Sequence, residues 1–115
     1  MKITPDKRIG IIGGVGRTGS QFARLFEGKG YTVDVTGSKN KERNARLIQD
    51  CHVVIFSVPL RSSVEIMEEC MKHSTRKDQL VLDLSSLKSK QVHALLQGQG
   101  EVIGMHPLFG PWTNV

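Results

Sequence analysis

The fold of this chain follows from one stretch of its sequence, RIGIIGGVGRTG at residues 8–19. Residues 8–12 are mostly apolar and the run stops at glycines, a pattern typical of a buried strand. From about Arg17 to Lys29 the apolar side chains recur at helical spacing, and Gly28 and Gly30 mark the end of this segment. The stretch therefore predicts a strand, a glycine turn and a helix in immediate succession.

The glycines of this stretch follow the GxGxxG pattern, at Gly14, Gly16 and Gly19. In a strand–turn–helix unit one glycine makes the tight turn, the next lets the backbone approach a pyrophosphate, and the third lets the helix pack on the strand. The pyrophosphate binds N–H groups at the helix N-terminus, where the helix dipole favours its charge. A purely structural glycine turn is the alternative. The residues expected to bind a dinucleotide are Gly14, Val15, Gly16, Arg17, Thr18 and Gly19.

Strands and helices alternate along the rest of the chain. The further predicted strands are Tyr31–Thr36, His52–Val58, Leu80–Leu84 and Val102–Met105, and the further predicted helices are Lys41–Gln49, a helix capped by Ser63 that continues to Met71, and Ser89–Leu96. This order predicts a parallel sheet with right-handed crossovers. The expected fold class is α/β: a Rossmann-type, doubly wound, mainly parallel sheet in three layers, compact and incomplete at its C-terminus.

Composition limits what such a domain can do. The length of 115 residues suits one domain, which we expect to comprise residues 1–115. The net charge of +5 favours anionic partners, such as a phosphate-bearing cofactor or a dicarboxylate substrate, although a solvated basic face is the alternative. Aromatic residues make up 5% of the chain and do not interleave with the basic clusters, so we expect no nucleic-acid partner.

The sequence also bears on cellular location. No apolar run approaches the roughly 20 residues of a membrane span, and the polar N-terminus does not resemble a signal peptide. We therefore expect a cytoplasmic protein with no membrane partner. Cys51 and Cys70 lack CxxC spacing and are expected to be free thiols in a reducing compartment. His52, His73 and His93 do not cluster in the sequence, so no metal site is expected.

The end of the second predicted strand bears on the choice of cofactor. An acidic residue there accepts hydrogen bonds from the adenosine ribose and repels a 2′-phosphate. Here Gly37, Ser38 and Lys39 follow the strand, and Asp34 lies too early. The Ser38 hydroxyl can donate to a phosphate and Lys39 supplies charge, so we expect NADP to be preferred over NAD. Arg17 favours the same cofactor, because its side chain leaves the glycine loop near this pocket. Alternatively, Lys39 only begins a solvated charged helix.

Three further segments carry a family resemblance. VIFSVPL at 54–60, LDLSSLK at 82–88 and VIGMHPLFGP at 102–111, together with the glycine loop, resemble the cofactor domain of prephenate dehydrogenase or the closely similar arogenate dehydrogenase. The resemblance covers essentially the whole chain. The short interval before Val53 resembles the compact form of that family, in which one strand is lost or reduced. Because ligands bind at the carboxyl ends of strands in open α/β sheets, Ser57, Val58 and Pro59 are expected to line the dinucleotide cleft.

The resemblance implies an NAD(P)-dependent oxidoreductase of tyrosine biosynthesis. The family oxidises prephenate by hydride transfer, and loss of CO2 makes the ring aromatic. His106 matches the family's catalytic histidine, which accepts a hydrogen bond from the substrate hydroxyl as hydride departs, and Pro107 restricts its backbone to an extended form. Ser86 matches the serine that hydrogen-bonds the hydroxyl, the histidine or the nicotinamide region, and Lys88 matches the family's lysine. Without the resemblance, His106-Pro107 could be a turn and Ser85-Ser86 a helix cap.

Members of the family continue into a helical domain that dimerises, closes over the substrate and supplies arginines for its carboxylates. This sequence ends at Val115. We therefore expect the isolated chain to be inactive on its anionic substrate, prephenate or arogenate, unless a further domain is supplied. The exposed edges of an incomplete sheet favour a homodimer. Two alternatives are a stand-alone, non-catalytic NADP-binding or regulatory module, and the cofactor domain of another NADP-dependent reductase, such as an imine reductase.

Overall fold

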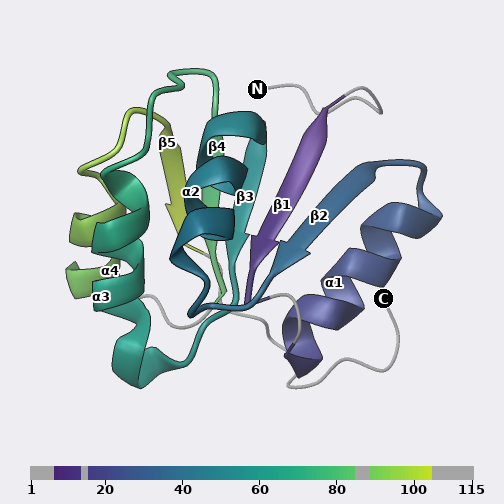
Figure 1. Ribbon diagram of the computed structural model, residues 1–115, viewed down its shortest axis with the longest axis horizontal. Coiled ribbons are helices and arrows are strands. Elements are labelled where there is room, and N and C mark those ends of the chain that lie inside the picture. Colours follow the sequence, from purple (N-terminus) through teal and green to yellow (C-terminus); the bar gives the residue numbers. More distant parts are fainter. Residues whose placement is uncertain (1–6, 14–15, 85–88, 105–115) are drawn as a thin grey trace.

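The structure, a computed structural model, describes residues 7–13, 16–84 and 89–104, which form a sheet flanked by helices (Figure 1). The strands are β1 (Arg8–Ile12), β2 (Thr32–Thr36), β3 (Val53–Phe56), β4 (Leu80–Asp83) and β5 (Glu101–Gly104). The helices are α1 (Arg17–Gly28), α2 (Lys41–Asp50), α3 (Leu60–Met71) and α4 (Ser89–Leu95). The sheet order is β2-β1-β3-β4-β5, and every neighbouring pair is parallel. The predicted α/β class is confirmed, and the described sheet is entirely rather than mainly parallel.

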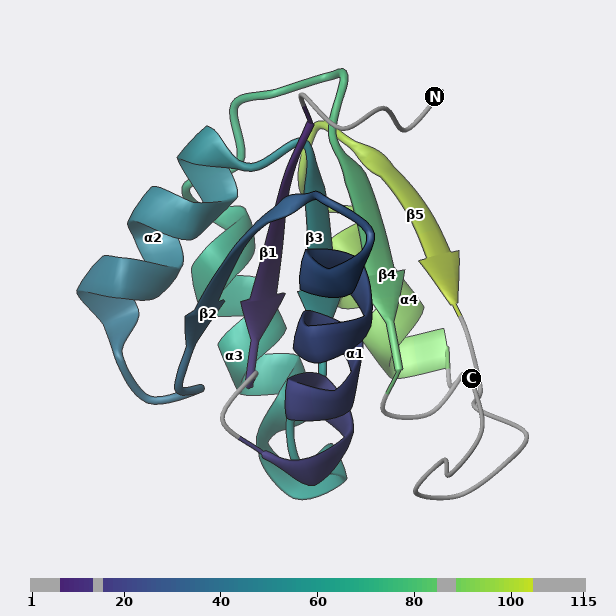
Figure 2. The ribbon, with the colours of Figure 1, turned by 90° about the vertical axis from the view of Figure 1, so that its right-hand side faces the viewer.

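The helices lie in two layers, and the strand order explains why. From β1 the chain moves to β2 at one edge of the sheet, and from β2 it crosses back to β3 on the other side of β1. Because the crossovers are right-handed, these opposite directions put α1 on one face and α2, α3 and α4 on the other, as Figure 2 shows. The doubly wound, three-layer arrangement is therefore confirmed. The direction reverses between β1 and β3, which is where ligands bind in open α/β sheets.

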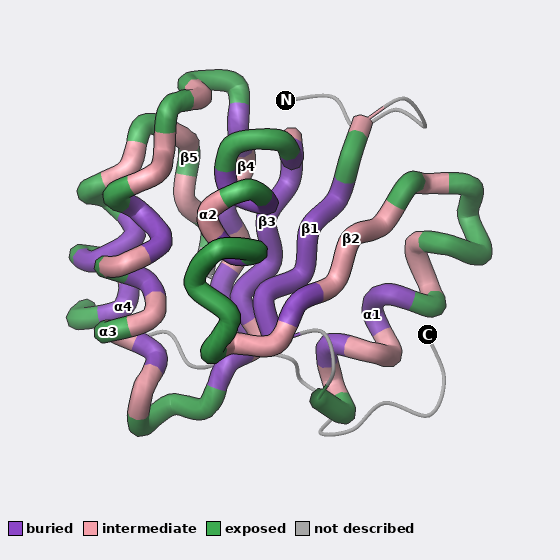
Figure 3. The backbone as a smooth tube through the Cα atoms, viewed as in Figure 1, coloured by how far each residue is buried: buried purple, intermediate pink, exposed green. Residues whose placement is uncertain are grey.

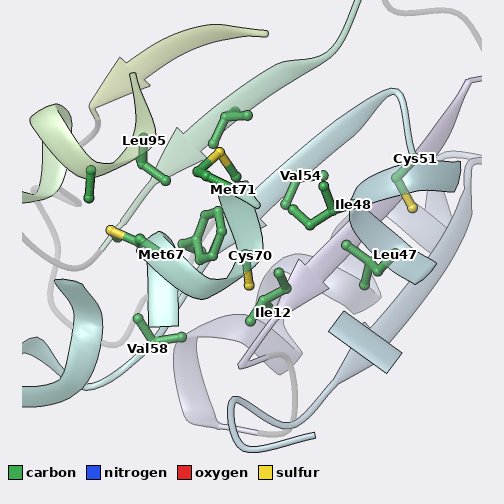
Figure 4. Close-up of a cluster of buried hydrophobic side chains, with 13 residues drawn as sticks. Ile12, Leu47, Ile48, Cys51, Val54, Val58, Met67, Cys70, Met71 and Leu95 are labelled. Atoms are coloured by element: carbon green, nitrogen blue, oxygen red, sulfur yellow. The ribbon is translucent and has the colours of Figure 1, made fainter. Parts of the chain in front are cut away.

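The larger hydrophobic core fills the space between the sheet and the layer of α2, α3 and α4 (Figure 4). All four residues of β3 are buried, as predicted for a central strand of a parallel sheet, and Figure 3 shows the buried positions concentrated along the central strands. The larger core comprises Ile12, Leu47, Ile48, Cys51, Val54, Phe56, Val58, Met67, Cys70, Met71, Val81, Ala94 and Leu95. The smaller core, under α1, comprises Ile9, Ile11, Phe22, Ala23, Val53, Ile55 and Leu84.

Helix α2 packs closely on β1 because Gly10 has no side chain. A Cβ at Gly10 would overlap Leu47 Cδ2 and would lie 2.8 Å from Cys51 Sγ. Both neighbours are buried, with exposed fractions of 6% and 0%. The strand glycine therefore makes room for the helix that leads from β2 to β3.

A buried glutamine fixes the other end of α2. Gln79, which is 1% exposed and directly precedes β4, donates from Nε2 to the carbonyl oxygens of Ile48 at 2.6 Å and Cys51 at 2.9 Å. The last carbonyls of a helix have no partner inside the helix. Gln79 supplies that partner, and it thereby ties the C-terminus of α2 to the amino edge of the sheet.

The sequence predicts Ser63 as the N-cap of α3, and this is wrong. The helix begins at Leu60, and Pro59 occupies the N-cap position. Ser63 is fully buried inside the helix, and its hydroxyl donates to the Leu60 carbonyl at 2.9 Å, a bond that serine often makes to the preceding turn. The same hydroxyl accepts from Gln91 Nε2 at 3.0 Å, which joins α3 to α4.

The predicted ends of the other elements agree with the structure to within one residue, except at β3. This strand begins at Val53 and already ends at Phe56, so Ser57 and Val58 follow the strand rather than belong to it. The apolar side chain of Val58 is what makes the sequence pattern predict a longer strand. Its side chain packs into the larger core from outside the strand.

Both thiols are free and buried, as expected. Burial raises the pKa of the Cys51 thiol and of the Cys70 thiol to about 12, so both are neutral near pH 7. Of the helices within the described ranges, none combines the length and the apolar character that crossing a membrane requires. Across the same residues, no three His, Cys, Asp or Glu side chains come together in a group that could hold a metal ion.

The substitution Gly10→Ala tests the contact between α2 and β1. We expect the free energy of unfolding to fall by about 1–3 kcal/mol, because the added methyl group displaces Leu47 or Cys51 in a packed core. The matched control is Gly28→Ala in α1, where an added Cβ meets no atom within 4 Å. Alanine there should raise stability by about 0.5–1 kcal/mol. Urea unfolding followed by circular dichroism measures both, and an unchanged stability of Gly10→Ala would contradict this account of the packing.

Candidate functional site

A cavity of about 340 Å³ lies at the carboxyl ends of the first three strands. Its lining comes from the glycine turn and the start of α1, from the turn after β2, and from the segment after β3. The cavity therefore sits where the winding direction reverses, which is the expected ligand position in this class of sheet. The lining residues are Gly13, Gly16, Arg17, Thr18, Ser38, Ser57 and Pro59.

Gly13 brings the glycine turn against the end of β3. Its φ is +88°, a left-handed conformation that favours glycine, and a Cβ there would overlap the carbonyl oxygen of Ser57. Two backbone bonds of 2.8 Å fix the turn, from Gly13 N–H to the Thr36 carbonyl and from Ser57 N–H to the Ile12 carbonyl. The sequence-based prediction did not include Gly13, although its place as the first of two glycines directly after the strand was an available signal.

The N-terminus of α1 opens onto this cavity. Gly16 is the N-cap, its own N–H donates to the Gly13 carbonyl at 3.1 Å, and among the described residues no side-chain hydrogen bond caps the helix. The first turn contains no acidic residue. The first N–H groups of a helix have no partner inside the helix and carry the positive end of its dipole. At Arg17 and Thr18, which both line the cavity, this arrangement suits an anionic ligand such as a diphosphate.

The segment after β2 forms a tight turn with Ser38 and Lys39 at its centre. The Asn40 N–H donates to the Gly37 carbonyl at 3.2 Å, and the Asn40 side chain then caps α2. Asp34 lies away from this turn: its carboxylate pairs with Arg8 Nε at 3.0 Å. The carboxylate of Asp34 is therefore paired with Arg8. The turn that follows β2 carries the hydroxyl of Ser38 and the ammonium group of Lys39.

A second cavity of about 620 Å³ adjoins the first and runs between α2 and α3. Ser38 and Pro59 line both cavities, so the two spaces meet at the carboxyl edge of the sheet. At its end near the turn, the second cavity is lined by Lys39 and Lys41. Its full lining is Ser38, Lys39, Lys41, Asn44, Ala45, Pro59, Ser62, Glu65, Ile66, Glu68, Glu69, Cys70, Lys72 and His73.

The charges of the second cavity differ between its two helices. Lys39 lies in the turn before α2 and Lys41 is the first residue of that helix, whereas Glu65, Glu68 and Glu69 belong to α3. The hydrogen bond from Lys72 lowers the pKa of Glu69, and this pair is 3.1 Å apart. Cys70 is neutral because of its raised pKa, so no thiolate nucleophile faces this space near pH 7. The part of the cavity closest to Ser38 is therefore the part that suits an anion.

The structure brings most of the described candidates together. Gly16, Arg17, Thr18, Ser38, Ser57 and Pro59 line the first cavity, and Lys39 lines the second. Two candidates lie elsewhere: Gly19 is buried in α1, and the Val58 side chain is 5% exposed in the larger core. The predicted residues Gly14, Val15, Ser86, Lys88 and His106 lie outside the described residues.

Sequence reasoning also missed Lys41 and Asn44. Lys41 lines the second cavity from the first turn of α2. Asn44 is buried beside the turn. Its sequence signal is that a polar residue stands three and four positions before Leu47 and Ile48, on the helix face that is otherwise apolar.

Comparison with known proteins assigns the domain. Residues 20–114 match the family described as "Prephenate dehydrogenase, nucleotide-binding domain". The chain belongs to this family. The match includes the turn after β2 and the segment after β3, and it confirms the resemblance seen in the sequence. This prephenate dehydrogenase-family domain therefore carries its two cavities at the carboxyl edge of a nucleotide-binding fold.

Similar proteins share this domain over nearly its whole length. A T-protein of Enterobacter agglomerans is 31% identical over 95% of this chain, and a probable arogenate/prephenate dehydrogenase of Methanocaldococcus jannaschii is 33% identical over 91% of it. The crystal structure of prephenate dehydrogenase from A. aeolicus, in complex with hydroxyphenyl propionate and NAD+, is 25% identical. It superimposes with a TM-score of 0.68, covering 95% of this chain and 44% of that one. This chain spans 29% and 27% of the lengths of the two curated relatives.

Proposed function

We propose that this domain binds a nicotinamide dinucleotide with its diphosphate in the cavity at the carboxyl ends of β1 and β3. One observation carries the proposal: the uncapped N-terminus of α1 opens onto a cavity at the reversal point of the sheet. The diphosphate accepts hydrogen bonds from the first N–H groups of the helix, at Arg17 and Thr18. Gly13 and Gly16 let the backbone approach it closely.

The adenosine half then extends from Ser38 into the second cavity, between α2 and α3. Ser38 lines both cavities. In the proposed complex it therefore lies beside the bond between the diphosphate and the adenosine ribose. Lys39 and Lys41 supply positive charge on that side, and Asp34 is held by Arg8. A hydroxyl donor with two cations stabilises a 2′-phosphate better than a bare ribose hydroxyl. We therefore propose NADP as the preferred cofactor, with NAD as the weaker ligand.

Calorimetric titration of NADP and NAD tests this proposal. We expect Ser38→Asp to weaken NADP binding about tenfold or more and to favour NAD, because a carboxylate repels the 2′-phosphate and accepts from the ribose. Lys39→Ala should weaken NADP binding about threefold to tenfold and leave NAD nearly unchanged. Lys77→Ala, at an exposed site that lines neither cavity, is the matched control. Equal affinity of the unaltered protein for both dinucleotides would rule out the phosphate pocket.

In the reaction that family membership suggests, oxidative decarboxylation of prephenate or arogenate, the bound nicotinamide accepts a hydride. We propose that His106 accepts the proton of the substrate hydroxyl, and that Ser86 hydrogen-bonds the substrate, the histidine or the nicotinamide region. Both assignments rest on their match to the family's motifs. Because the chain spans less than a third of its curated relatives, we also propose that residues 1–115 act as the cofactor domain and that a further domain holds the substrate.

An assay of this chain with NADP and prephenate tests that division of labour. We expect turnover by residues 1–115 far below the range of about 1–1000 per second that is typical of enzymes, because in this proposal a further domain holds the substrate. The appearance of reduced nicotinamide is followed by absorbance, and a complete prephenate dehydrogenase serves as the positive control. Turnover within the typical range by this chain alone would contradict the proposal.

We propose that a second copy of this chain pairs at the β5 edge of the sheet. At the opposite edge, the Thr36 carbonyl faces β1, so the Val35 carbonyl faces outward, and Arg43 Nη2 donates to it at 2.9 Å. One outward carbonyl of that edge therefore already has a partner. At β5, Ile103 is 47% exposed beside its partner Leu82, and α1 does not reach over β5 in Figure 2. An exposed edge with apolar neighbours favours strand pairing.

Sedimentation velocity tests this self-association. We expect a dimer at high protein concentration, and a monomer for Ile103→Lys, because a charge on an edge strand opposes pairing. The control is Leu60→Lys, which alters a residue of similar exposure, 46%, at the start of α3. A single monomeric species of the unaltered protein at every concentration would disprove the dimer.

The compartment that we propose is the cytoplasm. Cys51 and Cys70 are free and buried, which suits a reducing environment. A biosynthetic role within the prephenate dehydrogenase family would place the protein beside its soluble substrate and cofactor.

A further inference from the structure

Asn44 is a polar residue in an apolar setting. It lies in the second turn of α2, at the spacing that places it on the same face as Leu47 and Ile48, and it is only 4% exposed. Burying an amide costs free energy unless both its donor and its acceptor find partners. A buried asparagine at this position is therefore expected to hydrogen-bond through both its amide oxygen and its amide nitrogen.

Both groups of the Asn44 amide bond to the end of β2 and to the turn that follows it. Oδ1 accepts from the Thr36 hydroxyl at 2.9 Å, and Nδ2 donates to the Ser38 carbonyl at 3.1 Å. Thr36, at the end of the strand, is 1% exposed, and Ser38 lies at the centre of the tight turn. A second bond closes the same turn, between Gly37 and Asn40. The Ser38 backbone is therefore held toward α2 from inside the protein.

The same bonds extend to the glycine turn. The backbone carbonyl of Thr36 accepts from the Gly13 N–H at 2.8 Å. A continuous path of hydrogen bonds thus runs from Gly13 through Thr36 and Asn44 to Ser38. It joins the two places where the proposed ligand carries phosphate: the cavity at α1, and the turn that lines both cavities.

We propose that Asn44 is a positioning residue that sets the preference of the site for NADP over NAD, by fixing the Ser38 turn at the distance from the glycine turn that a 2′-phosphorylated ribose requires. This inference rests on the proposed dinucleotide function. The role needs a short side chain that donates and accepts at once: leucine can do neither, and aspartate has no donor for the Ser38 carbonyl.

The test is calorimetric titration of Asn44→Leu with NADP and, separately, with NAD. We expect the affinity for NADP to fall about tenfold and that for NAD by no more than about threefold, so the preference ratio falls. The diphosphate contacts at α1 do not involve Asn44, which is why NAD binding is largely retained. A loss of fold alone would lower both affinities together and would leave their ratio unchanged.

The matched control is Gln79→Leu. Gln79 is also a buried amide that donates to backbone carbonyls at one end of α2, but at the amino edge of the sheet, away from the turn. Both substitutions remove buried hydrogen bonds and lower the melting temperature. Only Asn44→Leu should change the ratio of the two affinities.

A second pair of variants keeps the inference testable if Asn44→Leu does not fold. Thr36→Val removes the hydroxyl that donates to Asn44 at nearly constant side-chain volume, and Thr36→Ser retains it. We expect Thr36→Val to lower the preference ratio about threefold, and Thr36→Ser to keep the ratio of the unaltered protein.

The titration results distinguish a failure of the proposed role of Asn44 from a failure of the proposed dinucleotide function. If the unaltered protein binds neither dinucleotide, the proposed function is wrong and the role of Asn44 falls with it. If the unaltered protein prefers NADP but Asn44→Leu, or Thr36→Val in its place, keeps the same ratio, the function stands and the role of Asn44 is overturned. The role is also overturned if Gln79→Leu changes the ratio as much as Asn44→Leu.

Discussion

The close approach of the glycine turn to the end of β3 shapes the whole carboxyl edge of the sheet. At Gly13 any side chain would overlap the Ser57 carbonyl, and the positive φ there turns the chain directly from β1 toward α1. Because the turn is this tight, the uncapped N-terminus of α1 lies beside the segment after β3, and a cavity remains between them. The anion-binding property of a helix terminus and the reversal point of the sheet thus coincide at one place.

Helix α2 is fixed to the sheet by three different contacts. Gly10 lets the helix approach β1, Gln79 satisfies carbonyls at its C-terminus, and Asn44 bonds to the turn before its N-terminus. The first contact is apolar packing, which sets a distance but little direction. The two buried amides add direction, because each loses free energy if its bonds are not made. This combination holds the turn at Ser38 in a defined place relative to the glycine loop.

The sequence predicted the elements well and the site less completely. Strands and helices were found because apolar runs, helical spacing and glycines are local signals that tertiary contacts did not override here. The prediction for Ser63 was wrong because a serine before an apolar stretch resembles a cap, whereas its hydroxyl bonds to the Leu60 carbonyl one turn earlier and to Gln91 in another helix. Gly13 and Asn44 were missed for a related reason. Their importance comes from contacts with Ser57 and Ser38, and hydrophobic periodicity alone does not reveal which backbone groups a glycine or a buried amide will meet.

The order of apolar runs and glycines was enough to predict an α/β chain with a glycine turn after its first strand, since backbone sterics and hydrophobic spacing act between near neighbours. The family motifs added which nucleotide-binding domain this is, and the match over residues 20–114 agrees. The tertiary structure then decided which of the predicted site residues lie together. Ser38 and Ser57 line one cavity, and the Val58 side chain packs in the larger core. The Asn44 amide bonds to Thr36 through its oxygen and to Ser38 through its nitrogen. Those outcomes follow from strand order and close packing, which bring distant segments together under constraints that no short stretch of chain contains.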